Sequence, residues 1–301
     1  MSPKISVLIP VHNTELFLAN CLKSVISQTL NEIEIICVED ASEDHSGLVL
    51  KRYAEKDSRI RIIWHNKNEG THKARKDAVL VARGKYIMFL DSDDELFPNA
   101  CEVAYNAIES NNTDAIQFGV QSIDSKGNYI ATKSWFITEY TDRIDNNWLH
   151  LYDRKQIKSW ETWNKIYKAD LCKNAFKQMD DDYLIIAEDV YFFCVYGYLA
   201  KSISMIEDVL YKYRQGFGIW SGIQGKISLE KYKILLSQKK ALDAIQRYYK
   251  TKPDAKKFEP IIQRRVKTHF LRLSLLWLHY GLQDTDKAEG LQLFAETWGN
   301  K

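Results

Sequence analysis

Short apolar segments alternate with helical patterns over the first 120 residues of this chain. The segments ISVLIP, IEIICVED, IRIIWH, KYIMFLD and DAIQFGV predict strands, and helical patterns lie between them. One such helix, THKARKDAVLVARG, is expected to end at Gly84 as its C-terminal cap. Near-continuous apolar strands separated by helices indicate an α/β fold, with a mostly parallel central sheet that helices cover on both faces. In such sheets, ligands bind outside the carboxyl ends of the strands.

Composition narrows the class of protein. The chain has 301 residues, of which 45% are hydrophobic and 12% aromatic, which is ample for a sizeable core and argues against disorder. The five cysteines are scattered without a CxxC pair, which predicts a reducing compartment rather than a disulfide framework. The first residues lack the long apolar region of a signal peptide, and no segment reaches transmembrane length. We therefore expect a cytoplasmic protein.

The fourth predicted strand ends on three carboxylates, Asp91, Asp93 and Asp94. Like charges this close repel one another and resist leaving water, so we expect a positive partner or open solvent beside them. One interpretation is a helix N-terminus, where aspartates cap free amides. The other is a hard divalent cation held by one or two carboxylates, with substrate phosphates and water as its remaining ligands. An Asp-x-Asp alone does not decide between the two.

Other strand ends carry groups that suit a nucleotide. Glu39 and Asp40 follow the second strand, and an acidic side chain there can bond a ribose hydroxyl or a base N–H. Asn68 and Gly70 stand in a loop before a basic helix start that includes Arg75, which suits diphosphate oxygens. The alternative for the basic residues is a solvated helix face.

These segments, in this order, resemble the family 2 glycosyltransferases with the GT-A fold. The matching segments are SVLIPVHN, VEDAS, NEGTHKAR, FLDSDDEL and AEDVYF, and the resemblance covers roughly Lys4 to Gly216. It implies a GT-A type nucleotide-binding domain, a nucleotide diphosphate sugar that is UDP-linked, and a Mn²⁺ or Mg²⁺ ion with Asp93 as direct ligand and Asp91 assisting. The nucleotide-sugar-binding residues that it implies are Pro10, Val11, Glu39, Asp40, Asn68, Gly70, Arg75, Asp91 and Ser92.

A Glu-Asp pair, Glu188 and Asp189, opens a later helical segment. Composition alone favours a simple charge pair at a helix N-terminus. The order of the segments instead implies that Asp189 is the catalytic base, with Glu188 or Glu161 as the next candidates. The segment WETWNKIYKADL resembles a family segment that borders the acceptor. The acceptor-side residues implied in this way are Trp163, Asn164, Lys165, Glu188 and Arg214.

The resemblance implies an inverting transfer of one sugar to a hydroxyl of a glycan or lipid-linked acceptor, as in bacterial surface polysaccharide synthesis. The Gln-x-x-Arg-Trp signature of processive members is absent, which favours addition of a single sugar. A nucleotidyl- or phosphoryl-transferase would also use an acidic metal site, and a non-catalytic sugar-nucleotide binding module would keep Asp40 and Asp93. Neither alternative needs an isolated base at Asp189, so the intact Glu-Asp pair disfavours both.

The chain is expected to divide into two parts. A glycosyltransferase domain is predicted over residues 1–220, with a donor half over about 1–120 and an acceptor half over about 121–220. Two long helical patterns close the chain, and they predict a helical C-terminal extension over residues 221–301.

The C-terminal extension begins with a strongly basic stretch. Residues 226–267 hold 13 Lys or Arg against 4 Asp or Glu. The helical pattern that follows places Phe270, Leu273, Leu276 and Trp277 on one face, which suggests binding to an anionic membrane surface. The alternative is that this face packs on the catalytic body or on a second subunit. Nucleic acid is not expected as a partner, because no recognisable binding module accompanies the charge.

Overall fold

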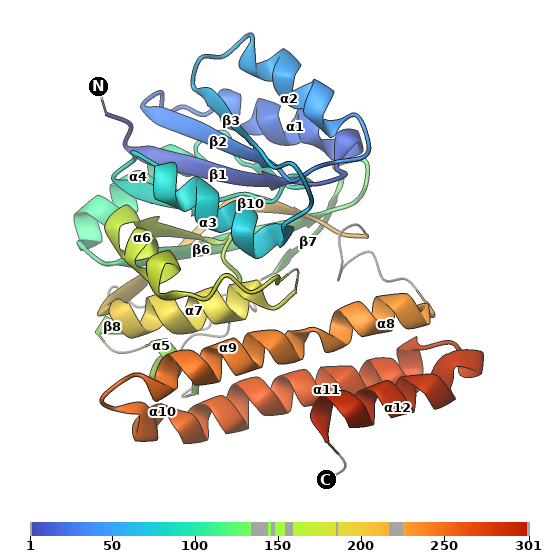
Figure 1. The fold of residues 1–301 in the computed structure, drawn as a ribbon. Helices are drawn as coiled ribbons and strands as arrows, with labels where there is room; N and C mark the ends of the chain where they lie inside the picture. Colours follow the sequence, from blue (N-terminus) through green and yellow to red (C-terminus); the bar gives the residue numbers. More distant parts are fainter. Residues whose placement is uncertain are drawn as a thin grey trace.

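A ten-stranded sheet runs through the protein (Figure 1). The computed structural model describes residues 2–133, 144–145, 148–153, 159–184, 186–216 and 225–299. The strand order is β3-β2-β1-β4-β9-β6-β10-β5, with β7 paired to β6 and β8 paired to β10. The strands are β1 (Ile5–Val11), β2 (Ile33–Glu39), β3 (Ile60–Trp64), β4 (Tyr86–Phe89), β5 (Glu95–Leu96), β6 (Ala115–Ile123), β7 (Tyr129–Lys133), β8 (Ile144–Asp145), β9 (Lys165–Lys168) and β10 (Ser202–Arg214).

The first four strands pair in parallel, which confirms the predicted α/β fold with its mostly parallel sheet. Their side chains alternate between two cores: along β1, Val7 and Ile9 point into one core and Leu8 into the other. The register sets Val11 opposite Glu39 in β2. Because parallel strands run in one direction, the polar residues that follow β1, β2 and β4 converge at one edge of the sheet.

Helices cover both faces of the sheet, as the sequence predicts. One core lies between the sheet and the helices α1, α2 and α4, and the other between the sheet and α3, α6 and α7. The helices follow apolar stripes in the sequence, so each one buries the face that carries them. Their bounds are α1 (Glu15–Ile26), α2 (Ser46–Ala54), α3 (Gly70–Val81), α4 (Ala100–Asn111), α6 (Ala169–Gln178) and α7 (Glu188–Leu199).

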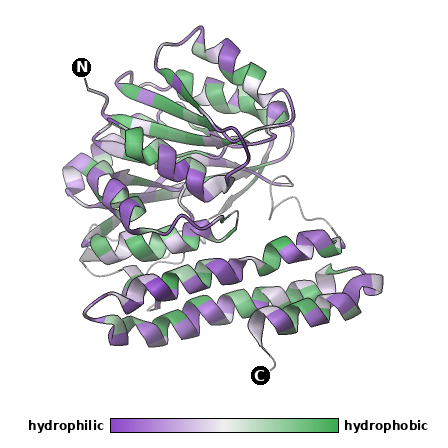
Figure 2. Ribbon diagram, viewed as in Figure 1, coloured by the Kyte–Doolittle hydropathy of each residue, from purple (hydrophilic) through white to green (hydrophobic). Residues whose placement is uncertain are grey.

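The C-terminal helices form a further layer beneath α7 (Figure 1). Helix α7 is buried along the whole stretch from Val190 to Gly197, because it lies between the sheet-side core and α9. Figure 2 shows hydrophobic residues along most of this helix. The remaining helical segments are α5 (Trp148–Asp153), α8 (Leu229–Leu236), α9 (Gln238–Lys250), α10 (Ala255–Ile261), the wider π-helical turns η2 (Ile262–Lys267) and η3 (Trp277–Gly281), α11 (Thr268–Leu276), the short η4 (Asp284–Asp286) and α12 (Lys287–Trp298).

The predicted boundary at residue 220 lies outside the described residues, so the division into two domains stays a prediction. One hydrophobic cluster extends from the sheet through α7 to Ala241, Ile245 and Tyr249 of α9. Within the described part of the chain, no helix combines the length and the apolar content that crossing a membrane requires.

The apolar face predicted on the last long helix is turned mainly inward. Phe270 is buried in the core that α7 and α9 share, and Trp277 packs with the small cluster around Tyr232. Of the two alternatives that the sequence left open, packing on the body of the chain describes these two residues. Leu276, in contrast, is 44% exposed.

The prediction that Gly84 caps helix α3 is also wrong. The helix ends at Val81, with Ala82 already extended. Gly84 instead lies against the start of β1, where its N–H donates to Ser6 Oγ (2.9 Å) and to Glu34 Oε1 (3.1 Å). A Cβ atom at this position would stand 2.5 Å from the backbone nitrogen of Ser6. The glycine is needed for close approach of two backbones rather than for a helix end.

We expect Gly84→Ala to lower the free energy of unfolding by about 1–3 kcal/mol, because the added methyl group must displace the backbone of β1. Denaturant titration followed by circular dichroism measures this change. Gly47→Ala is the matched control: its Cβ would meet the Trp64 ring at 3.2 Å, which is a side chain that can shift, and alanine favours the helix. Equal losses in the two variants would contradict this explanation.

Candidate active site

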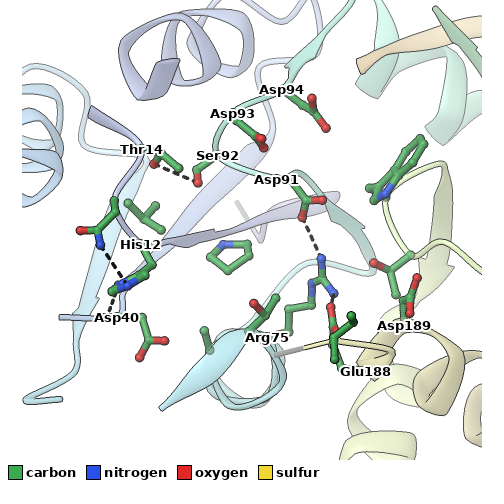
Figure 3. Close-up of a pocket in the computed structure, with 18 of the residues that line it drawn as sticks. His12, Thr14, Asp40, Arg75, Asp91, Ser92, Asp93, Asp94, Glu188 and Asp189 are labelled. Carbon is green, nitrogen blue, oxygen red and sulfur yellow. Dashed lines mark hydrogen bonds and ion pairs between the residues drawn. The ribbon is translucent and has the colours of Figure 1, made fainter. Parts of the chain in front are cut away.

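A cavity of about 370 Å³ opens at the edge of the sheet where β1, β2 and β4 end (Figure 3). Side chains from the strand ends form one wall, and the start of α7 forms the opposite wall. Ten of the residues predicted from the sequence line it. They are Pro10, Val11, Asp40, Arg75, Asp91, Ser92, Asp93, Trp163, Glu188 and Asp189.

Asp40 forms part of the wall after β2. It is only 3% exposed, and its carboxylate accepts hydrogen bonds from the backbone N–H groups of Glu69 (2.8 Å) and Gly70 (2.9 Å). Its neighbour Glu39 accepts from Ser42 N (2.7 Å) and so closes the turn after β2. Gly70 and Glu39 thus do not line the cavity themselves. Gly70 holds the carboxylate of Asp40, and Glu39 stabilises the loop that carries Asp40.

His12 is a lining residue that the sequence analysis did not select. Its Nδ1 donates to the carbonyl of Asp40 (2.8 Å), so Nε2 is the acceptor for the side-chain amide of Asn68 (2.9 Å). Asn68 therefore contacts the cavity wall through this ring. His12 could have been selected from its position in the sequence, because it directly follows β1 as Asp40 follows β2.

Other lining residues were also missed, among them Thr14, Thr71 and Tyr213. The Thr14 hydroxyl donates to Ser92 Oγ (3.0 Å), which links the loop after β1 to the loop after β4. Thr71 stands in the first turn of α3. Tyr213 comes from β10, which is distant in sequence, and no pattern in that strand marks it as a site residue.

The three aspartates after β4 have three different environments. Asp91 accepts a hydrogen bond from Arg75 Nη2 (2.7 Å). Asp94 is buried and accepts from Tyr211 Oη (2.7 Å) and from the backbone N–H of Arg214 (2.6 Å). Helix α4 begins only at Ala100, so the interpretation of this cluster as a helix cap is wrong.

The carboxylate of Asp93 lines the cavity beside Asp91. Burial and the neighbouring Asp91 raise the pKa of Asp93 to about 6. The oxygen donors of Asp91 and Asp93, facing one cavity with excess negative charge, fit a hard divalent cation. Arg214 supports this loop from behind, donating from Nε to the carbonyl of Asp93 (2.8 Å) and from Nη2 to Glu95 Oε1 (2.6 Å).

Arg75 connects this wall to the opposite one. From helix α3, Nη2 reaches Asp91 and Nη1 reaches Glu188 Oε1 at the start of α7 (both 2.7 Å; Figure 3). The guanidinium is 5% exposed, and the two carboxylates outweigh burial and raise the pKa of Arg75. A permanent cation therefore sits between two acidic groups that would otherwise repel.

Asp189 lies beside this bridge, on the first turn of α7. Its carboxylate accepts from the backbone N–H of Val190 (2.8 Å). Burial, together with the negative charges of Glu188 and Glu161, raises the pKa of Asp189 well above that of an ordinary aspartate. The preceding Ala187 has a left-handed φ of 61°, which turns the chain sharply into the helix. A carboxylate with a raised pKa in a cavity is suited to accept a proton.

Trp163 and Tyr213 form an aromatic wall next to Asp189. Their rings stack with centroids 5.2 Å apart and an interplanar angle of 10°. Asn164 and Lys165 follow Trp163 but are fully buried, and the Lys165 ammonium donates to the carbonyl of Glu161 (2.7 Å) and to Asn164 Oδ1 (2.7 Å). Burial lowers the pKa of Lys165 to about 7. Asn164 and Lys165 thus lie in the interior, where they hold the loop that carries Trp163 in place.

Comparison with known proteins assigns the family. The family model "Glycosyl transferase family 2" matches residues 6–185. The chain is 31% identical over 259 residues to the uncharacterized glycosyltransferase EpsJ of Bacillus subtilis strain 168, covering 83% of this chain and 71% of EpsJ. It is 35% identical over 214 residues to the poly(ribitol-phosphate) beta-glucosyltransferase of Bacillus spizizenii, covering 70% of this chain and 32% of that protein. This chain belongs to glycosyltransferase family 2 and is a glycosyltransferase.

The chain spans 61% of the B. subtilis relative EpsH and 30% of the Streptococcus pneumoniae relative GlyA, so it matches only part of several relatives. Solved structures agree with the fold. Residues 1–349 of S. aureus TarS with UDP-GlcNAc superpose with a TM-score of 0.71 at 19% identity, covering 98% of this chain and 80% of that chain. The mannosyltransferase PcManGT of Pyrobaculum calidifontis, with GDP-Man and Mn²⁺, gives 0.55 at 13% identity, covering 99% and 74%. The GT-A fold predicted from the sequence is thus confirmed.

We expect Arg75→Met to lower the free energy of unfolding by about 3–5 kcal/mol, because it removes a buried cation from between the partly buried carboxylates of Asp91 and Glu188. Urea titration measures the loss. Lys233→Met is the control, since the Lys233–Glu230 pair is largely exposed and its loss is expected to change the stability far less. An Arg75 variant as stable as the Lys233 variant would show that the bridge does not hold the walls together.

Proposed function

We propose that this enzyme transfers one sugar, with inversion, from a UDP-sugar to a hydroxyl of a glycan or lipid-linked acceptor in surface polysaccharide synthesis. The observation that carries the proposal is the single cavity that brings Asp40, the Asp91–Asp93 pair and Asp189 together. The fold neighbours were solved with UDP, UDP-GlcNAc and GDP-Man, which supports a nucleotide-sugar donor. A nucleotidyl- or phosphoryl-transferase and a non-catalytic binding module remain the rival hypotheses.

Each wall of the cavity has one task in this reaction. The nucleotide lies between the loop after β1 and Asp40, and the diphosphate lies toward Arg75 and Ser92. Asp93 and Asp91 would hold a Mn²⁺ or Mg²⁺ ion, which supplies positive charge for the departing diphosphate. The acceptor sugar lies toward Trp163 and the start of α7.

Asp189 takes the proton from the acceptor hydroxyl. The acceptor oxygen then forms a bond to the anomeric carbon as the bond from that carbon to the diphosphate oxygen breaks, and the proton stays on Asp189. Attack comes from the face opposite the leaving group, so one displacement inverts the anomeric configuration, as base-activated water does in inverting glycosidases. Arg75 holds Glu188, the residue adjacent to Asp189, and so fixes the first turn of α7.

Nucleotide diphosphate release from a panel of nucleotide sugars, with Mn²⁺, Mg²⁺ or chelator, tests the proposal. Transfer to acceptor with release of UDP supports it. Release of pyrophosphate or phosphate would indicate the nucleotidyl- or phosphoryl-transferase, and binding without turnover across the panel would indicate the binding module.

Asp93→Ala should abolish metal-dependent turnover and weaken donor binding while the fold stays intact. Because the folded-state pKa of Asp93 is raised to about 6, ionising this group costs stability as the pH rises from about 4 through 6. The variant should therefore melt at a higher temperature than the wild type at pH 8 in chelator, and this gain should vanish at pH 4. Full activity of Asp93→Ala in saturating Mn²⁺ would refute the metal assignment.

Asp189→Asn should bind the nucleotide sugar normally but lose about a hundred- to ten-thousand-fold in kcat, which is the usual contribution of a general base. Calorimetry and kinetics on one preparation separate the two effects. A normal kcat would place the base elsewhere, with Glu188 or Glu161 next to test.

The pH profile supplies the control for this assignment. A base must be deprotonated, and the pKa of Asp189 is raised by burial, Glu188 and Glu161, so kcat should rise with pH and level off above that raised pKa. Glu161→Gln removes one of the negative charges and should shift the rising limb to lower pH without abolishing turnover. An unmoved limb would argue against Asp189 as the titrating group.

We propose in addition that the enzyme is cytoplasmic and attaches to the anionic inner membrane surface through its C-terminal helices. Part of the basic stretch is neutralised within the chain: Arg264 and Arg265 pair with Asp153, and Arg247 pairs with Asp180 and Asp182. The surface left for lipid is the outer face of α10–η3, where basic and apolar side chains are both exposed. It comprises Lys256, Lys257, Lys267, Arg272, Leu275, Leu276 and Tyr280.

Co-sedimentation with vesicles tests the membrane proposal. Binding should rise with anionic lipid content and fall with salt, because the attraction is partly electrostatic. The double variant Leu275→Ser, Leu276→Ser should lower the bound fraction severalfold, whereas Leu48→Ser, at an exposed leucine on α2, should not. Equal recovery with neutral and anionic vesicles would end the membrane proposal.

A further inference from the structure

His65 lies directly behind Asp40, outside the cavity. It follows β3, and its backbone N–H donates to the carbonyl of Glu39 (2.9 Å), which places it beside the turn that carries Asp40. The ring is 6% exposed. Its Nδ1 lies 2.7 Å from Asp40 Oδ1, and its Nε2 lies 3.1 Å from Asp77 Oδ2 on helix α3. The sequence analysis did not select His65.

Both ring nitrogens of His65 lie within hydrogen-bond distance of a carboxylate oxygen. The ring is thus held on two sides, between Asp40 and Asp77. Asp77 is itself held by Lys73, whose ammonium lies 2.5 Å from both of its oxygens. These contacts fix the ring against α3, so the ring in turn fixes Asp40.

The contacts of Asp40 leave one acceptor position open. A carboxylate offers about four lone-pair positions. The Oδ1 atom receives His65 Nδ1 and Glu69 N, and Oδ2 receives Gly70 N. Since Asp40 lines the cavity, the remaining lone pair of Oδ2 is available to a ligand that donates a hydrogen bond. The imide N–H of uracil is such a donor, whereas N3 of cytosine is an acceptor.

We infer that His65 is a positioning residue for base recognition: it locks the Asp40 carboxylate in the rotation that aims its free lone pair at a uracil imide. This inference rests on the proposed UDP-sugar donor. Without the ring, the carboxylate keeps only the two amide contacts from the loop before α3 and can rotate. The enzyme then loses discrimination between bases rather than its fold.

A second use of this cluster is a cation site. The ligand atoms of His65, Glu69 and Asp77 lie within 4.8 Å of one another. Both ring nitrogens are already engaged, however, and Lys73 already neutralises Asp77. The cluster is charge-compensated by the chain itself, so positioning is the better explanation. Metal binding is one outcome of the test.

The experiment measures dissociation constants of UDP and CDP by calorimetry in Mn²⁺, for the full chain and four variants. His65→Phe keeps a ring of similar shape without donors, and should shrink the preference for UDP over CDP about tenfold. His65→Asn places an amide donor near the position of Nδ1, and should restore most of the preference. Asp77→Ala removes the acceptor that holds the ring against α3, and should give an intermediate loss. His279→Leu, at an exposed histidine on η3, is the matched control and should change nothing.

Kinetics add a readout that a purely structural role would not give. His65→Phe should raise the KM for the UDP-sugar about tenfold with kcat within about twofold of the wild type, because base binding is equal in ground and transition states. His65→Leu replaces the Phe variant if that variant does not fold, and the same changes are expected of it.

Two results would overturn the inference. One is equal weakening of UDP and CDP, or no weakening, in the His65→Phe variant. The other is stoichiometric Zn²⁺ or Mn²⁺ that is lost with His65 while base preference is unchanged, which would make the cluster a cation site. A wild type that binds no nucleotide would instead refute the proposed function, so the two failures can be told apart.

Discussion

The buried guanidinium of Arg75 is the contact on which the active site depends. It joins a carboxylate at the end of β4 to a carboxylate at the start of α7, and these lie almost a hundred residues apart in the chain. Without a cation there, Asp91, Glu188 and Asp189 would face one another in a poorly hydrated space, and their repulsion would push α7 away from the sheet. The donor wall and the acceptor wall can therefore stand close together because one side chain from α3 reaches both. Arg75 pairs with Asp91 and Glu188, and the carboxylates that stand beside them, Asp93 and Asp189, are the two to which we assign chemistry.

Much of this arrangement follows from sequence because it is local. A strand buried on both faces must be mostly apolar, so β1, β2 and β4 are visible in the sequence as apolar runs, and the polar residues that end them are visible as candidates. Asp40, Asp91 and Asp93 were found in that way. Tyr213 and His65 were not, because their placement depends on pairing between distant strands and on the register of a loop against a helix. Nothing in the few residues around them carries that information.

Two cases show that one sequence pattern can have more than one physical cause. A glycine after a helical stretch is equally suited to a left-handed cap and to close contact between backbones, and Gly84 has the second role. An apolar stripe on a helix says that the stripe is covered, but not by what. Phe270 is covered by the chain's own α7–α9 core, whereas Leu276 of the same stripe and its neighbour Leu275 remain exposed. The periodicity of a helical segment shows which of its faces is apolar, and only the tertiary structure shows what packs against that face.

Helix α7 is apolar on nearly every side, since the sheet-side core lies against one face and α9 against another. The Tyr249 hydroxyl of α9 even donates to the carbonyl of Cys194 in the middle of α7 (2.9 Å). This packing limits which parts of the gene can be exchanged by recombination. A recombination event that joined this catalytic half to the tail of another family member would leave the helix that carries Asp189 without its matching surface. Helix α7 and the C-terminal helices must therefore change together in evolution. In a chimaera of two such enzymes, the crossover between the parents should lie before α5 rather than after β10.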